Sequence, residues 1–222
     1  MNQNKLKKIV SKEALKYIVP NSIIGIGTGS TIIKFIKLLK KIKNLIKGAV
    51  SSSFISTNYL KKIGIPIINI NKIDKLSIYI DSADEINNDL EMIKGGGGAL
   101  TKEKIIAASA QKFLCIVDES KYVKKLGKFP LPIEIIPMSC SYVVSEITKL
   151  GGYPKIRNNF ITENYNKIID VYNFNIINPS ILENKINNIP GVVTVGIFTK
   201  DCSADIALIS TTNLGIIKIK KK

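Results

Sequence analysis

Two aspartates stand three residues apart, directly after a short apolar run. Asp81 and Asp84 flank Ser82 and Ala83, and residues 77–80 before them are predicted to form a buried strand. Two carboxylates held close together raise the pKa of one of them, which suits proton transfer. An acidic turn at the protein surface has the same composition, so the pattern alone leaves both interpretations open. Two carboxylates without other ligands are a weak indication of a metal site.

A second set of polar residues lies in a glycine-rich loop between a predicted strand and a predicted helix. Residues 25–31 have the sequence GIGTGST. Glycines let backbone N–H groups approach an anion, and the start of the following helix adds positive potential. No GK[ST] motif follows, and Ser30 replaces the last glycine of the dinucleotide fingerprint. The loop predicts a phosphate site without a nucleotide, and a tight turn capped by Ser30 or Thr31 explains it equally well.

A lysine and a glutamate surround a run of four glycines. Lys94 precedes residues 95–98, and Glu103 falls in the first turn of the next predicted helix. Consecutive glycines are costly in chain entropy unless the backbone must bend or approach a ligand. Lys94 could hold a developing oxyanion, and Lys121, just after another predicted strand, could counter a phosphate. Solvated lysines and a glutamate paired with the helix dipole explain each residue taken alone.

The chain of 222 residues has no histidine. This excludes Ser-His-Asp triads, Cys-His pairs and imidazole metal ligands. A general base that works near neutral pH must then be a carboxylate, a perturbed lysine, a cysteine or a tyrosine.

The formal net charge of +16, from 33 Lys+Arg and 17 Asp+Glu, raises nucleic acid as a partner. Arg157 is the only arginine, however, and nucleic-acid readers favour the arginine fork. The lysines are spread along the whole chain, and the abundant Lys, Ile and Asn residues have A+T-rich codons. Biased base composition therefore explains much of the charge, and we expect no nucleic-acid partner. A nucleic-acid-binding protein would instead bind tightly with steep salt dependence.

Cysteine usage and the N-terminus indicate a compartment. Cys115, Cys140 and Cys202 form no CxxC pair and are odd in number, which is typical of reduced thiols inside the cell. The first residues lack the apolar segment of a signal peptide, and no apolar run is long enough to cross a bilayer. We expect a cytoplasmic protein without a membrane partner.

The polar loops follow strands that alternate with helices. Helices are predicted at 5–19, from the turn at 28–31 to about 41, near 57–63 and at 101–112, and strands at 23–27, 49–53, 66–70, 77–80 and 113–117. This alternation predicts an α/β fold with a Rossmann-like, mostly parallel sheet. Ligands bind beyond the carboxyl ends of such strands, so the loops meet at one edge. That coincidence favours an enzyme for a small phosphorylated substrate.

The pattern changes after residue 128, where FPLP resembles a linker. Strands are predicted at 133–136, near 154–157, at 167–173 and at 192–198, with helices at 139–150 and 179–189. The order β-α-β-β-α-β is the ferredoxin-like unit. Residues 129–198 are therefore predicted to form a smaller inserted α+β domain, a plausible oligomerisation surface. Strands at 204–210 and 216–219 return to the first domain, which comprises residues 1–128 and 199–222.

Seven runs together closely resemble ribose-5-phosphate isomerase, type A, of the bacterial kind. They are GIGTGST (25–31), AVSSS (49–53), YIDSADEIN (79–87), MIKGGGGALTKEKIIA (92–107), VDESK (117–121), LGKFPLPIEIIPM (126–138) and NIPGVVTVGIF (188–198). The resemblance implies an aldose–ketose isomerase of the pentose phosphate pathway, non-oxidative branch. Such an enzyme interconverts D-ribose 5-phosphate and D-ribulose 5-phosphate through an enediolate, with no metal or organic cofactor. A homodimer, or a tetramer, is also implied.

The resemblance implies roles residue by residue. Glu103 matches the base that moves the proton between C2 and C1, and Lys94 matches the residue that steadies the enediolate. Asp81 and Asp84 match the pair that assists ring opening and hydroxyl proton transfer. The implied substrate-binding residues are Thr28, Gly29, Ser30, Thr31, Asp81, Ser82, Ala83, Asp84, Lys94, Gly95, Gly96, Gly97 and Lys121.

Ser82 departs from the family, which usually has glycine in a DGADE motif. If this position needed a positive φ, serine would strain the turn. We expect a compatible conformation, because both flanking aspartates are present.

Two other functions of the same fold are a different sugar-phosphate isomerase and a sugar-phosphate-sensing regulator without catalysis. The presence of Glu103 and Lys94 argues against lost catalysis.

Overall fold

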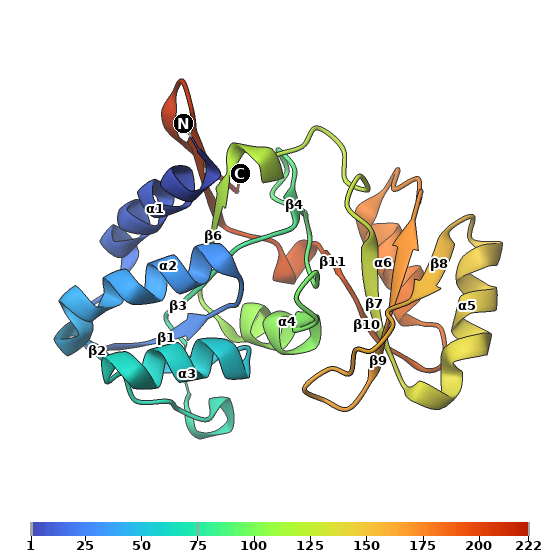
Figure 1. The fold of residues 1–222 in the computed structure, drawn as a ribbon, viewed down its shortest axis with the longest axis horizontal. Coiled ribbons are helices and arrows are strands. Elements are labelled where there is room, and N and C mark those ends of the chain that lie inside the picture. The colour runs from blue at the N-terminus through green and yellow to red at the C-terminus, as the bar shows by residue number, and fades with distance from the viewer. Residues whose placement is uncertain (1, 75, 222) are drawn as a thin grey trace.

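A six-stranded sheet forms the core of the larger part of the molecule in the computed structural model, which describes residues 2–74 and 76–221. The strand order is β13-β12-β6-β3-β1-β2, and all neighbouring strands are parallel except β12 and β13. The strands are β1 (Ser22–Ile26), β2 (Ile46–Ser51), β3 (Ile78–Asp81), β6 (Phe113–Asp118), β12 (Ile206–Thr211) and β13 (Gly215–Lys220). The predicted mostly parallel α/β sheet is confirmed (Figure 1).

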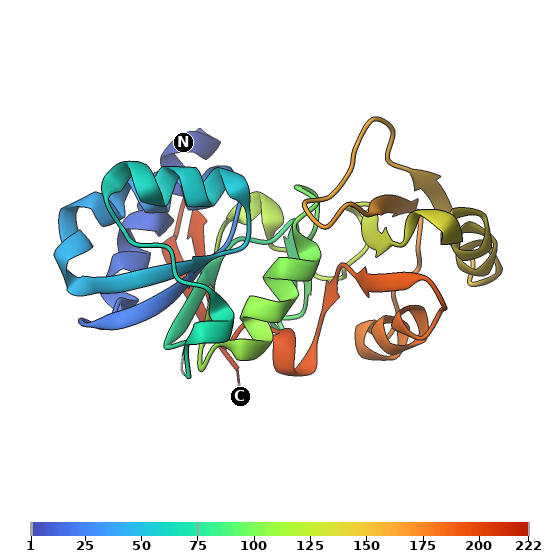
Figure 2. The ribbon, with the colours of Figure 1, turned by 90° about the horizontal axis from the view of Figure 1, so that it is seen from below.

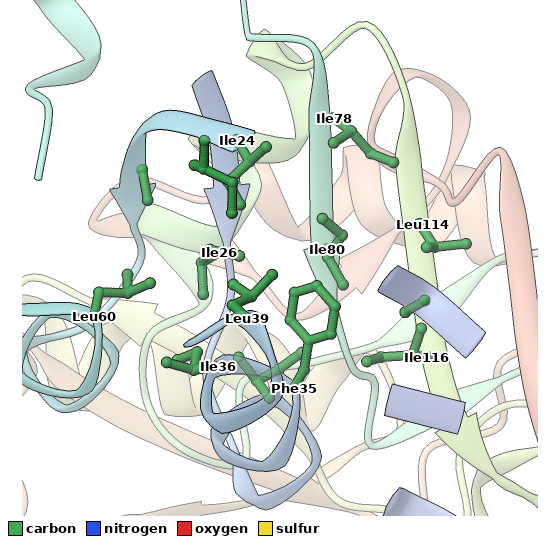
Figure 3. Packing of buried hydrophobic residues seen from close by; sticks show 14 of the residues in the cluster. Ile24, Ile26, Phe35, Ile36, Leu39, Leu60, Ile78, Ile80, Leu114 and Ile116 are labelled. Atoms are coloured by element: carbon green, nitrogen blue, oxygen red, sulfur yellow. The ribbon is translucent and has the colours of Figure 1, made fainter. Parts of the chain in front are cut away.

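Helices cover both faces of this sheet. On one face lie α1 (Gln3–Ala14), α2 (Ser30–Leu39) and α3 (Phe54–Ile63), and Figure 3 shows Phe35 and Leu39 of α2 beside Ile26 of β1. On the other face α4 (Leu100–Ser109) contributes Leu100 and Ile106 to a second core cluster. Because both faces are covered, the inner strands β1, β3, β6 and β12 are nearly continuous apolar runs.

A four-stranded antiparallel sheet lies at the opposite end of the molecule (Figures 1 and 2). It follows the chain order β7 (Leu131–Ile135), α5 (Cys140–Lys149), β8 (Tyr153–Ile156), β9 (Lys167–Tyr172), α6 (Pro179–Asn187) and β10 (Val192–Val195). The strand order is β10-β7-β9-β8. This is the β-α-β-β-α-β arrangement that the sequence predicted.

A three-stranded sheet, which the sequence did not predict, adjoins both larger sheets. It consists of β4 (Glu85–Ile86), β5 (Met92–Ile93) and β11 (Ile197–Phe198), in the order β11-β5-β4. The strand predicted at 192–198 is therefore wrong as one element, because it divides at Gly196 between two sheets. The Gly196 N–H donates to the Pro132 carbonyl at 2.7 Å, and its own carbonyl accepts from Lys94 N–H at 2.9 Å.

The strand predicted at 66–70 is also wrong. The structure has a single bridge between Ala49 and Ile67 there, and a 3-10 helix follows at Ile70–Lys72. The segment is held to the sheet edge by the Ala49 N–H, which donates to the Pro66 carbonyl at 2.8 Å, and by the Ile68 N–H, which donates to the Ala49 carbonyl at 2.9 Å. Pro66 has no N–H with which to extend the ladder. The first helix is shorter than predicted, because α1 ends at Ala14 and a 3-10 turn continues to Tyr17.

None of the helices in the described part of the chain is long and apolar enough to cross a membrane.

Candidate active site

A cavity of about 520 Å³ opens at the carboxyl edge of the six-stranded sheet, beyond β1, β3 and β6. This is the edge at which parallel α/β sheets bind ligands. The lining residues are Gln3, Lys7, Thr28, Gly29, Ser30, Thr31, Ile33, Ile55, Ser82, Ala83, Asp84, Lys94, Gly95, Gly96, Gly97, Glu103, Val117 and Lys121. Every residue that the sequence predicted for the site lines this cavity, except Asp81, which lies directly beneath it and contacts Lys94.

A buried lysine joins the two acidic elements of the site. Lys94 Nζ lies 2.7 Å from Asp81 Oδ2 and 3.3 Å from Glu103 Oε2, and it donates to the Ser82 carbonyl at 2.5 Å. Burial lowers the pKa of the Lys94 ammonium, but the neighbouring Asp81 and Glu103 carboxylates outweigh burial, so that the pKa is raised. Lys94 is therefore a fixed positive charge at the floor of the cavity.

Glu103 reaches this charge because it lies on the buried face of α4. Leu100, Glu103 and Ile106 recur every three residues along the helix and are all buried. The Glu103 side chain is 4% exposed, and within the described part of the chain its Oε2 atom accepts no hydrogen bond. The 3.3 Å contact with Lys94 is thus an ion pair only.

The environment of Glu103 changes its proton affinity. Burial raises the pKa of the Glu103 carboxyl group to about 8; the Lys94 ammonium opposes this effect, and the Asp81 and Asp84 carboxylates reinforce it. A carboxyl group with a pKa near the working pH can both take up and release a proton. Glu103 is therefore suited to general acid–base chemistry.

Asp81 is held from four directions. Its Oδ2 accepts from Lys94 and from the buried Tyr79 hydroxyl at 2.5 Å, and its Oδ1 accepts the N–H groups of Thr28 at 3.1 Å and Ser82 at 2.7 Å. A side chain at Gly27 would clash, because a Cβ there would lie 1.8 Å from the Asp81 carboxyl group. The glycine in this loop thus makes room for a carboxylate of the protein itself.

Tyr79 was missed by the sequence analysis. Burial, together with Asp81 and Glu103, raises the pKa of its hydroxyl group, which therefore remains a donor to Asp81. The available signal was strand alternation: Tyr79 and Asp81 are two residues apart in β3 and point to the same face.

Ser82 adopts a backbone conformation without a positive φ, in contrast to the glycines of the neighbouring loops. The serine causes no strain of the kind that a left-handed conformation would impose. The expected compatible conformation is confirmed.

Asp84 contacts the glycine run. Its Oδ2 accepts the Gly96 N–H at 2.8 Å, and a Cβ at Gly96 would lie 2.8 Å from Asp84 Oδ1. Gly95 has a φ of 109°, a conformation that glycine adopts readily. The backbone of the run therefore approaches the carboxylate as closely as it does because no side chain intervenes.

Lysines and hydroxyl groups meet at the mouth of the cavity. Ser30 and Thr31 begin α2, and Lys7 Nζ donates to Ser30 Oγ at 3.0 Å. Lys121 lines the same cavity. A helix N-terminus with hydroxyl donors and two nearby ammonium groups can bind a phosphate.

Lys7 and Gln3 were also missed by the sequence analysis. Both lie on α1, whose sequence pattern shows only an amphipathic helix, and the tertiary structure brings this helix beside β6.

Histidine, cysteine, aspartate and glutamate side chains do not gather in threes or more at any point of residues 2–74 and 76–221 where a metal ion could be held.

Comparisons of the sequence and of the structure with known proteins point to the same family. The model of the family "Ribose 5-phosphate isomerase A (phosphoriboisomerase A)" matches residues 48–213. Ribose-5-phosphate isomerase A of Buchnera aphidicola subsp. Baizongia pistaciae is 62% identical over 213 residues, covering 96% of this chain and 97% of the relative.

Two solved structures extend the match to the fold. Ribose 5 phosphate isomerase A from Neisseria gonorrhoeae has a TM-score of 0.96 and 45% identity, covering 100% of this chain and 98% of the other. A D-ribose-5-phosphate isomerase in complex with phospho-erythronic acid has a TM-score of 0.94 and 38% identity, with coverages of 99% and 100%. The chain belongs to the ribose 5-phosphate isomerase A family.

Proposed function

We propose that the cavity at the carboxyl edge of the six-stranded sheet is the active site of an isomerase. As a member of its family, the chain interconverts ribose 5-phosphate and ribulose 5-phosphate, an intramolecular oxidation and reduction in the pentose phosphate pathway. The observation that carries the location of the site is the buried Glu103 carboxyl group, which lines the cavity 3.3 Å from Lys94 Nζ.

Glu103 is the base in this proposal. It takes the proton from C2 of the open-chain aldose, and the electron pair of the broken C–H bond forms the C1–C2 double bond of an enediolate. As this double bond forms, the electron pair of the C1 carbonyl moves onto O1. The same carboxyl group then returns the proton to C1, and the proton that leaves the C2 hydroxyl passes to O1, so that C1 becomes a CH₂OH group and C2 becomes the ketone carbonyl. A pKa of about 8 supports both directions of transfer.

Lys94 and the two aspartates act on the oxygens. The Lys94 ammonium is fixed by Asp81 at 2.7 Å and stabilises negative charge on the enediolate oxygens. Asp81 and Asp84 assist ring opening and move the hydroxyl proton. Asp84 lines the cavity, whereas Asp81 lies beneath it, so Asp84 is the nearer of the two to a bound sugar.

The phosphate group of the substrate binds at the mouth of the cavity. The Thr28–Thr31 loop offers three hydroxyl groups and the N-terminus of α2, and Lys7 and Lys121 add positive charge. The solved relative that holds phospho-erythronic acid, a small phosphorylated sugar acid, supports this class of ligand.

The isomerisation needs no metal or organic cofactor in this proposal, since Lys94 supplies the positive charge. The test is conversion of ribose 5-phosphate in D₂O with and without EDTA. We expect deuterium at C1 of ribulose 5-phosphate and equal rates in both samples. A product that stays free of deuterium over many turnovers would contradict the enediolate, and loss of activity with EDTA would indicate a metal.

The four-stranded sheet with α5 and α6 is the proposed inserted domain, residues 129–198, and the proposed surface of a homodimer or tetramer. Tyr142, Tyr153 and Tyr172 on its helix and strands are exposed, and aromatic side chains of this kind are enriched in interfaces. Sedimentation equilibrium tests this. A monomer at the concentration of the activity assay would contradict it.

A cytoplasmic location completes the proposal. It is supported by the odd number of cysteines, which suits a reducing compartment, and by the central metabolic reaction. Fractionation of cells that express the tagged chain tests it, and recovery of the chain outside the cytoplasmic fraction would contradict it.

A further inference from the structure

We propose that Arg157 is a positioning residue that holds Asp84 in place for the reaction, through the peptide group between Gly95 and Gly96. This inference rests on the proposed role of Asp84 in ring opening and hydroxyl proton transfer. Arg157 lies just after β8 of the four-stranded sheet and does not line the cavity.

One peptide group links the two side chains. Both terminal nitrogens of Arg157 donate to the Gly95 carbonyl at 3.4 Å, and Nη1 also donates to the Gly96 carbonyl at 3.2 Å. The N–H on the other side of the Gly95–Gly96 peptide donates to Asp84 Oδ2 at 2.8 Å. A trans peptide directs its C=O and N–H in opposite directions, so this group is held between a cation and a carboxylate.

Arg157 is itself rigidly placed. Its Nε donates to Asp170 Oδ2 at 2.8 Å and its Nη2 to Asp170 Oδ1 at 2.6 Å, the two-pronged arrangement that guanidinium and carboxylate groups favour. The guanidinium carbon lies 5.1 Å from the centre of the Phe160 ring. With its side chain only 18% exposed, Arg157 can impose its geometry on the glycine run.

Arginine is suited to holding both Asp170 and the glycine run, and lysine is not. Every other basic residue of the chain is a lysine, yet arginine stands here. The guanidinium group can satisfy Asp170 with one edge and the Gly95 and Gly96 carbonyls with the remaining N–H groups. A lysine ammonium is a single point of charge on a flexible chain and cannot span both partners.

The glycine run needs such support. Gly95 and Gly98 have positive φ values, and the backbone of Gly95, Gly96 and Gly97 has no side chain to anchor it. Without Arg157 these residues gain backbone freedom, and the N–H that holds Asp84 moves with them. A small displacement of a reacting group is sufficient to slow catalysis.

The test is a double-mutant cycle between Arg157 and Asp84. We expect Arg157→Lys and Arg157→Ala to lower kcat by ~10-fold or more in the otherwise unchanged chain, because a misplaced catalytic group costs up to ~10²-fold. In an Asp84→Asn background the same changes are expected to lower kcat by less than ~2-fold, since their effect acts through Asp84. Guanidinium ion added to R157A should restore part of the rate, and ammonium ion should not.

Glu163→Gln is the matched control. Glu163 lies on the same segment and bridges to α4 through Lys102 at 2.7 Å, but it does not contact the glycine run. We expect kcat within ~2-fold of the unchanged chain. Thermal unfolding of each variant shows which of them are folded.

Each outcome decides a separate claim. If R157K lowers kcat by the same factor in the unchanged chain and in the D84N background, the positioning role is overturned. It is also overturned if R157A loses activity because it is unfolded and guanidinium does not restore the rate. Unchanged turnover in D84N alone overturns the proposed role of Asp84 itself. Non-additivity together with guanidinium rescue supports the inference.

Discussion

Two buried glutamates lie at the first turn of α4, and they differ in their environment. Glu103 lies in that turn, and Glu134 on β7 accepts a hydrogen bond from Thr101 in the same turn. Their partners differ in kind. Glu103 faces a cavity and a lysine ammonium, whereas Glu134 is enclosed by neutral donors.

The two carboxyl groups also differ in how completely they are paired. Both oxygens of Glu134 accept hydrogen bonds, and the donors are Thr101, Thr162, Asn164 and Asn166. Glu103 Oε2 accepts no hydrogen bond from the residues that the structure describes. A buried carboxylate with all its hydrogen bonds made stabilises its surroundings, and one left incompletely paired beside a cavity is available for proton transfer. The same substitutions at the two positions test this difference.

The largest expected effect is on turnover. Glu103→Gln removes the base and leaves the volume unchanged, so we expect kcat to fall by at least ~10²-fold while the chain stays folded. Glu134→Gln is the matched control, since the Thr101 hydroxyl can turn to accept from the new amide, and its kcat should change by less than ~3-fold. Steady-state kinetics and circular dichroism measure both. Near-normal turnover in E103Q would contradict the proposed base.

The next effect is on stability. Glu134→Ala removes the shared acceptor of four donors, and we expect the free energy of unfolding to fall by about 2–4 kcal/mol. Urea unfolding of E134A beside E134Q measures it. An E134A chain as stable as the unchanged one would show that these hydrogen bonds contribute nothing.

The pH dependence of kcat/KM separates the two glutamates further. The pKa of Glu103 is raised to about 8, and a base acts only when ionised. We therefore expect kcat/KM to rise ~10-fold per pH unit below that pKa and to level off above it. E134Q should show the same profile. A profile that is flat from about pH 6 to 9 would remove Glu103 from the role of base.

The smallest effect is the dependence of stability on pH. Because the folded state raises the pKa of Glu103 from 4.5 to about 8, it binds this proton more tightly than the unfolded state does. The stabilisation is complete below the unfolded pKa and is lost as pH rises through about 8. Compared with E103Q, the unchanged chain should lose stability as the pH rises from about 5 to about 8 and should lose little more above that. Parallel unfolding curves at every pH would contradict this.

Much of the fold was predictable because its signals are local. The apolar run of β6 and the position of Glu103 in the first turn of α4 need only nearby residues. The three-stranded sheet was not predictable, because β4, β5 and β11 have two residues each and no periodicity. Their pairing depends on contacts between residues far apart in the chain.

The candidate site divides in the same way. Asp81 was predicted because it directly follows an apolar strand. Lys94 was predicted because it precedes a run of glycines whose entropic cost indicates a structural or binding role. Tyr79, Lys7 and Arg157 were not, because a strand tyrosine, a helix lysine and an arginine at the end of a strand have no chemical signature until the fold gives them partners.

The sequence by itself determined the chemistry available to this protein. The absence of histidine left carboxylates as the most accessible bases, and the order of strands and loops placed Glu103, Lys94 and the aspartates at one edge of a sheet. Only the tertiary structure decided which carboxylate is reactive. Proton affinity depends on burial and on charges a few ångströms away. The Asp81 and Asp84 carboxylates that act on Glu103 are about twenty residues from it, and Arg157 reaches Gly95 across 62 residues.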